Sequence, residues 1–127
     1  MGLRVKGFAK IALVVLFAIP AHADSGAVLS GVAGVKDGDG ILFCDVEVRL
    51  QGIAAPEYRR GQTEAGGREA LRALEALAKG KVVRCVLDGT TARRRPVGIC
   101  YFDGQDLGAA MLEAGFARDC PRYSKGR

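Results

Sequence analysis

Residues 35–57 read VKDGDGILFCDVEVRLQGIAAPE, and their pattern decides the expected fold. Over Val46–Leu50 the apolar residues alternate with Glu47 and Arg49, which is typical of a half-buried strand. Two short apolar runs, 31–36 and 41–43, come before it. Turn-forming residues at 37–40 and at 44–45 separate the three runs. This stretch therefore predicts a three-stranded meander.

The rest of the chain changes from a strand period to a helical one and back. Apolar residues recur every three or four positions over 63–79, which predicts a helix that ends at Gly80. Gly66 and Gly67 weaken its first turn, so a start nearer Arg68 is the alternative. Residues 81–87 and 97–102 are predicted strands joined by a polar, basic loop. Asp106 is placed to cap a second helix that ends at Gly115.

Three strands, a helix, two strands and a helix predict a mainly β, α+β fold. This order favours a small closed barrel, a five-stranded OB-fold Greek-key barrel with two helices. Other α+β arrangements also fit the pattern.

The N-terminus has the features of a secretory signal peptide. Basic residues open it, an apolar run follows at 11–19, and Ala21-His22-Ala23 offers a cleavage site after Ala23. A retained membrane anchor is the alternative, but the run is about half of the roughly 20 residues that a spanning helix needs. We expect a signal at 1–23, a lead-in at 24–31, one domain at 32–120 and a tail at 121–127. The protein is thus expected to be secreted or periplasmic.

Composition excludes several kinds of site. The only histidine, His22, lies in the signal, so the mature chain has no histidine catalysis and no histidine metal site. The net charge of +5 includes three signal cations, and the remaining charge of about +2 does not by itself predict a polyanion partner.

The four cysteines follow the signal and match no zinc pattern, so an oxidising compartment favours disulfides. Three full pairings are possible. Cys85 to Cys100 is the most economical single bridge if their segments form a hairpin, and Cys44 could stay free.

Charged residues gather near the ends of the predicted strands: Asp37, Asp39, Arg49, Glu57 and the run 93–95. Guanidinium groups match phosphate oxygens in pairs, and a carboxylate such as Glu57 can orient or deprotonate water. Hard oxygen ligands such as Asp39 suit Ca²⁺ or Mg²⁺. Each feature alone also has an ordinary interpretation, as a turn, a surface ion pair or a solvated loop.

Taken in order, these segments resemble the thermonuclease family, the staphylococcal nuclease-like domain, from about Val32 to Ala117. The likeness rests on the DGD turn, the run VRLQGIAAPE and the closing helix DLGAAMLEAGFA. It implies an OB-fold barrel and Ca²⁺-dependent hydrolysis of DNA and RNA phosphodiester bonds.

The resemblance assigns roles by position. Asp39 falls on the aspartate that binds Ca²⁺ in the family, and Asp37 falls on its outer neighbour. Arg49 and Arg95 fall on the two arginines that grip the phosphate. Glu57 falls on the glutamate that manages the attacking water.

The chain also departs from the family pattern. Ala54 stands where a second Ca²⁺-binding aspartate is usual, and Gly40 stands where a threonine is usual. Losing one ligand predicts a weakened Ca²⁺ site, with Mg²⁺ as a possible substitute. Cleavage is then expected to be slow and to improve in Ala54→Asp. Arg94 and Tyr123 are the candidate substrate-binding residues.

Two main hypotheses follow from this resemblance. The first is an exported, divalent-metal-assisted nuclease that acts on DNA or RNA without sequence specificity, as a monomer with no membrane contact after signal cleavage. The second is a catalytically inactive OB-fold module that binds nucleic acid or phosphate. A disulfide-stapled structural domain of the cell envelope is a third interpretation. It would require Arg49, Glu57 and Arg95 to lie apart in space.

Overall fold

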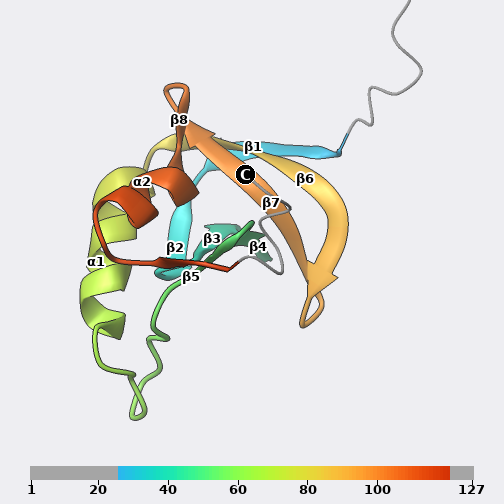
Figure 1. Ribbon diagram of the computed structural model, residues 1–127. Helices are drawn as coiled ribbons and strands as arrows, with labels where there is room; N and C mark the ends of the chain where they lie inside the picture. Colours follow the sequence, from blue (N-terminus) through green and yellow to red (C-terminus); the bar gives the residue numbers. More distant parts are fainter. Residues whose placement is uncertain (1–25, 121–127) are drawn as a thin grey trace, which may run out of the picture.

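A computed structural model describes residues 26–120, which form a curved sheet with two helices packed on one side of it (Figure 1). The predicted signal, the predicted tail and Tyr123 lie outside the described residues. The strands and helices are β1 (Val28–Val32), β2 (Gly34–Asp37), β3 (Gly40–Phe43), β4 (Val46–Leu50), β5 (Ile53–Ala54), α1 (Gly67–Ala78), β6 (Val82–Ala92), β7 (Arg95–Phe102), β8 (Gln105–Asp106), α2 (Leu107–Glu113) and β9 (Arg118–Asp119).

The main sheet has seven strands in the order β1-β6-β7-β4-β3-β2, with β8 paired to β7. Only β4 and β7 run parallel, so the sheet is mixed. The prediction of a mainly β, α+β fold with two helices is confirmed. The sheet is not closed by pairing between its edge strands, so the closed barrel was wrong in that respect.

The two edge strands are consecutive in the chain. Ala33 alone separates β1 from β2, and the chain bends there, so the first half pairs with β6 and the second half with β3. Ala33 donates its N–H to the Lys81 carbonyl and accepts from the Gly80 N–H, both at 2.9 Å. The predicted first strand thus begins earlier than expected, at Val28 within the lead-in, and is divided at this bend.

The predicted loop at 88–96 is instead the end of a long hairpin. Strand β6 continues to Ala92 and β7 begins at Arg95, with these two residues directly opposite each other. The two-residue turn has φ of 49° at Arg93 and 67° at Arg94. Positive φ at both turn positions matches the twist of the flanking strands, so the hairpin persists although neither residue is glycine.

The helices follow the predicted periodicity. Helix α1 begins at Gly67, close to the later of the two predicted starts, because Gly66 has a φ of 85° that a helix cannot include. Asp106 caps α2 as predicted, and its Oδ1 accepts from the Ala109 N–H at 3.1 Å. Neither helix among residues 26–120 is long and apolar enough to cross a membrane.

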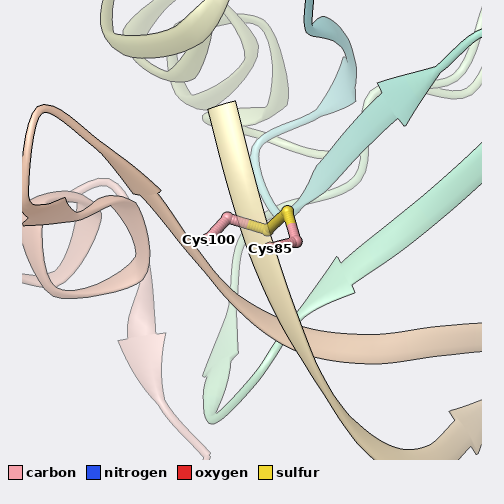
Figure 2. Close-up of a disulfide and its surroundings, with 2 residues drawn as sticks. All are labelled: Cys85 and Cys100. Carbon is pink, nitrogen blue, oxygen red and sulfur yellow. A yellow bond between two sulfur atoms is a disulfide. The ribbon is translucent and has the colours of Figure 1, made fainter. Parts of the chain in front are cut away.

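The core lies between the sheet and the helices. It includes Ile41, Val48, Leu74, Leu107 and Met111, which are all fully buried. A disulfide joins Cys85 on β6 to Cys100 on β7, directly opposite each other, which is the pair that the predicted hairpin favoured (Figure 2). Both cysteines are buried in the same core, and Cys44 and Cys120 are free thiols.

A second, two-stranded sheet brings the end of the described chain back beside the first half. Strand β9 pairs antiparallel with β5, so that Arg118 faces Ala54 and Asp119 faces Ile53. In Figure 1 the red end of the described chain runs back from α2 to the region of β5. The pairing places β9 next to the run that resembles the family's metal-binding and catalytic segment.

Candidate active site

A cavity of about 330 Å³ opens where the β2–β3 turn, the end of β4, strand β5 and the tip of the β6–β7 hairpin meet. Its lining includes five residues that the sequence singled out, from four separate segments: Asp37, Asp39, Arg49, Glu57 and Arg95. Arg49, Glu57 and Arg95 thus lie together, whereas the third interpretation, a structural domain, required them to lie apart. Arg94 does not line this cavity, and its neighbour Arg93 does.

Asp39 and Arg49 form an ion pair at the base of the cavity. Arg49 Nη1 lies 3.2 Å from Asp39 Oδ2, and the two side chains are only 16 % and 10 % exposed. The same Oδ2 accepts the backbone N–H of Ala55 at 3.0 Å. Gly38 makes this arrangement possible, since a Cβ there would lie 2.6 Å from Ala70 and 2.7 Å from Ala55. The close packing fixes the turn against α1.

Asp37 lies beside Asp39 and is strongly perturbed. Its Oδ1 accepts the Asp39 N–H at 3.3 Å. Burial, followed by the negative charge of Asp39, raises the pKa of Asp37 from 3.8 to about 6. Asp37 therefore takes up a proton just below neutral pH, which makes the cavity more positive.

Arg95 is held at the mouth of the cavity by Glu47 of β4. Its Nη1 lies 2.8 Å from Glu47 Oε1, and its Nε donates to the Ala92 carbonyl at 3.2 Å. Burial opposes the charged form of Arg95, but the hydrogen bond and charge of Glu47, with the charges of Asp39 and Asp37, raise its pKa overall. Arg95 is thus a fixed cation.

The Glu57 side chain is more exposed than those of Asp39, Arg49 and Arg95. Its carboxylate lies 3.5 Å from Arg59 Nε and 3.7 Å from Arg93 Nη1, and its side chain is 42 % exposed. Its backbone is tightly held, because Glu57 and Glu64 exchange hydrogen bonds and a Cβ on Gly67 would lie 2.3 Å from the Glu57 carbonyl oxygen. The start of α1 therefore positions Glu57 at the cavity, where its carboxylate is open to water.

Comparison with known protein families gives a match to the staphylococcal nuclease homologue family over residues 47–127, more than half of the chain. The chain belongs to this family. The match starts at Glu47, so it includes Arg49, Glu57 and Arg95 but not the two aspartates of the turn. A search of curated proteins finds no match.

The staphylococcal nuclease homologue family generally uses Ca²⁺, and the donor set at this cavity does not fit such an ion. Among residues 26–120 no group of three or more acidic, histidine or cysteine side chains could hold a metal. Ala54 offers no oxygen, and Asp39 Oδ2 is already engaged by Arg49 and Ala55. Ca²⁺ takes six to eight oxygen ligands. Two aspartates, one of which is already paired with an arginine, supply too few available oxygens for that coordination shell.

Four charged groups of this nuclease-homologue site were not chosen as site residues from the sequence, although one of them, Arg93, belongs to the basic run 93–95 that was singled out. Glu64, Arg93 and Arg118 line the cavity, and Glu47 holds Arg95. Glu47 had a signal, because it precedes Arg49 by two positions and so shares a strand face with it. Arg118 had no such signal in the sequence, because a strand of two residues is too short to show an alternating pattern.

A second cavity of about 500 Å³ continues from the first. The two share Asp37, Glu57, Arg93 and Arg95. The second adds Lys36, Glu47, Tyr58, Arg59 and Arg60 to the lining. It therefore extends the staphylococcal nuclease homologue site along a basic surface that carries one aromatic ring.

Proposed function

We propose that this protein binds nucleic acid through its phosphodiester backbone and hydrolyses it. The observation that carries this proposal is the meeting of Arg49, Arg95 and Glu57 at one cavity. Guanidinium groups fixed by acids are ready to stabilise the negative charge that builds on phosphate oxygens in the transition state. Membership of the staphylococcal nuclease homologue family supports the same substrate class.

The chemistry follows from the positions of these groups. Arg49 and Arg95 hold the non-bridging oxygens of one phosphate. Glu57 accepts a proton from a water molecule, the water oxygen forms a bond to phosphorus, and one phosphorus–oxygen ester bond breaks. The leaving oxygen takes its proton from solvent. No step in this sequence passes through a metal ion.

The second cavity favours a polymeric substrate over a single nucleotide. Lys36, Arg59 and Arg60 lie beyond Arg95 and can meet neighbouring phosphates, and Tyr58 offers a face for base stacking. Only 6 % of the chain is aromatic, so a long stacking platform is not available and recognition is expected to be independent of sequence.

We also propose that the protein acts outside the cytoplasm, as a monomer, after removal of residues 1–23. The disulfide between Cys85 and Cys100 supports this location, since such bonds persist in oxidising compartments.

Binding without cleavage is the second candidate function. It is favoured by Ala54 and by the ion pairs that Glu57 makes with Arg59 and Arg93, because these arginines occupy the carboxylate oxygens that would otherwise face water. In this case the same arginines hold a nucleic acid backbone and the water stays unactivated.

A single set of assays separates these candidates. Purified protein beginning at Asp24 is incubated with single-stranded and duplex DNA and with RNA, in Ca²⁺, Mg²⁺ or chelator, beside Glu57→Gln. The nuclease proposal expects cleavage that Glu57→Gln abolishes while binding remains. Binding without cleavage in both proteins supports the second candidate. Equal cleavage by Glu57→Gln points to a contaminating enzyme, and absence of binding contradicts both.

A further inference from the structure

Arg118 lies directly opposite Ala54 on the paired strands β9 and β5. Directly opposite residues of an antiparallel pair project to the same face, with their Cβ atoms about 5 Å apart. Both residues line the cavity that holds Arg49 and Arg95. An arginine is thus next to the one position where the usual family aspartate has become alanine.

The backbone holds this arginine in place. Asp119 pairs with Ile53, and the Cys120 N–H donates to the Gly52 carbonyl at 2.9 Å. The pairing therefore continues along β5 on one side of Arg118. Its Cα has a fixed position relative to the cavity, although its side chain is exposed.

Ion pairing distinguishes Arg118 from the other arginines at the cavity. Arg49 pairs with Asp39, Arg93 with Glu57, and Arg95 with Glu47. Among residues 26–120, Arg118 has no carboxylate within ion-pair distance. It is the cavity arginine whose positive charge is not already matched by an acid of the described chain.

Resting on the proposed function, we propose that Arg118 is a phosphate-binding residue whose guanidinium supplies, in this chain, the positive charge that a metal ion supplies where an aspartate occupies position 54. The substitution at Ala54 and the arginine opposite it then belong together. An aspartate there would sit against Arg118 and neutralise it, whereas alanine leaves the guanidinium available. Phosphate binding is accordingly independent of divalent metal.

Binding measurements in chelator test this role without relying on turnover. The probe is a short single-stranded oligodeoxythymidylate, titrated by calorimetry in the presence of EDTA. Arg118→Gln is expected to weaken binding by roughly tenfold or more, as for a lost charged hydrogen bond. Arg118→Lys retains part of the affinity, because lysine keeps the charge but not the planar fork. Arg72→Gln, on the exposed face of α1, is the matched control and leaves affinity unchanged.

Ala54→Asp provides a second, independent test. In EDTA the new carboxylate pairs with Arg118 across the strands and weakens oligonucleotide binding, whereas the neutral Ala54→Asn weakens it less. Unfolding temperatures of all variants show whether β9 stays paired.

The outcomes separate this inference from the function on which it rests. If Arg49→Gln and Arg95→Gln weaken binding but Arg118→Gln does not, the role of Arg118 is wrong and the phosphate site stands. If none of the three matters, the proposed function itself fails. If binding appears only with added Ca²⁺, or if Ala54→Asp strengthens binding in EDTA, the inference is overturned.

Discussion

Arg49 Nη1 lies 3.2 Å from Asp39 Oδ2 at the base of the cavity, in a pair that is almost entirely shielded from water. The aspartate receives a second donor from the Ala55 backbone at 3.0 Å. Asp39 thus joins three segments of the chain: the β2–β3 turn, strand β4 and the segment after β5. In this arrangement Asp39 holds the guanidinium of Arg49 in one orientation.

Replacing Asp39 with asparagine should therefore damage both stability and binding. The variant leaves a shielded guanidinium without its counter-charge, which is expected to cost about 2 kcal/mol of unfolding free energy. Urea denaturation measures this loss of stability. Oligonucleotide affinity is expected to fall as well, because the Arg49 guanidinium is no longer held in a fixed orientation. Glu75→Gln is the control, since it breaks the exposed pair with Lys79 and should cost less than about 0.5 kcal/mol. Equal losses in the two variants would show that the Asp39 pair has no special role.

Asp37 should make nucleic acid binding depend on pH in a defined window. Its pKa is raised to about 6 in the folded protein from 3.8. As pH falls through about 6, Asp37 loses its charge and the cavity becomes more positive, so oligonucleotide affinity rises. Asp37→Asn should remove this dependence, which a binding series from pH 5 to pH 8 will reveal. A wild-type series with the same slope as Asp37→Asn would contradict the assignment.

The same shift predicts a change in stability with pH. The folded protein holds the Asp37 proton more tightly than the unfolded chain does, so unfolding free energy falls as pH rises from about 4 to about 6. The effect is on the order of 1 kcal/mol after allowance for solvent screening. Relative to wild type, Asp37→Asn should gain stability over this window and hold that gain above it. The comparison by urea denaturation at pH 4 and pH 7 cancels the contributions of other groups.

The second cavity should reveal itself as a dependence of affinity on oligonucleotide length. Tyr58 and Arg60 line that cavity and not the first one. Arg60→Gln should lower the slope of log affinity against log salt by about 0.7 for a single strand, the value for one lost phosphate contact. Tyr58→Leu should weaken the binding of long oligonucleotides and leave the binding of a mononucleotide unchanged. An equal loss of affinity for oligonucleotides of all lengths would contradict a role of Tyr58 and Arg60 in binding the more distant nucleotides.

Removing the disulfide should destabilise the protein substantially. Cys85 and Cys100 close a loop of sequence separation 15, for which chain entropy predicts about 3 kcal/mol. Both sulfurs are buried, so Cys85→Ala with Cys100→Ala also leaves a small cavity. Thermal unfolding measures the sum of the two effects. Cys44→Ser is the control, because it replaces an exposed free thiol and should change the unfolding temperature little.

Much of the fold could be predicted because its strands have strong local patterns. The alternation at Val46–Leu50, the cap at Asp106 and the glycine ends of both helices were all visible in the sequence. The hairpin tip was missed because Arg93 and Arg94 are rare at positive φ, where asparagine and glycine are usual. The division of the first strand at Ala33 was missed because it depends on hydrogen bonds to Gly80 and Lys81, which lie far along the chain.

The sequence allowed the main residues of the candidate site to be chosen, but not the residues with which they pair. Arg49, Glu57 and Arg95 were placed by resemblance, and they do meet at one cavity. The pairing of Arg95 with Glu47 depends on β4 and β7 being neighbours in the sheet, which strand patterns alone do not specify. Arg118 depends on a two-residue strand, which is too short to leave a pattern.

The buried sulfur bridge also fixes how the inner parts of β6 and β7 pair. A hairpin that slips by one residue turns each side chain to the opposite face of the sheet. Cys85 and Cys100 can be joined only while they stand opposite each other. The register of the hairpin shifts between Leu87 and Thr91, so the bridge locks only the inner part of the two strands. The two-residue turn at Arg93 and Arg94 sets the pairing at the tip, where Arg95 meets Glu47.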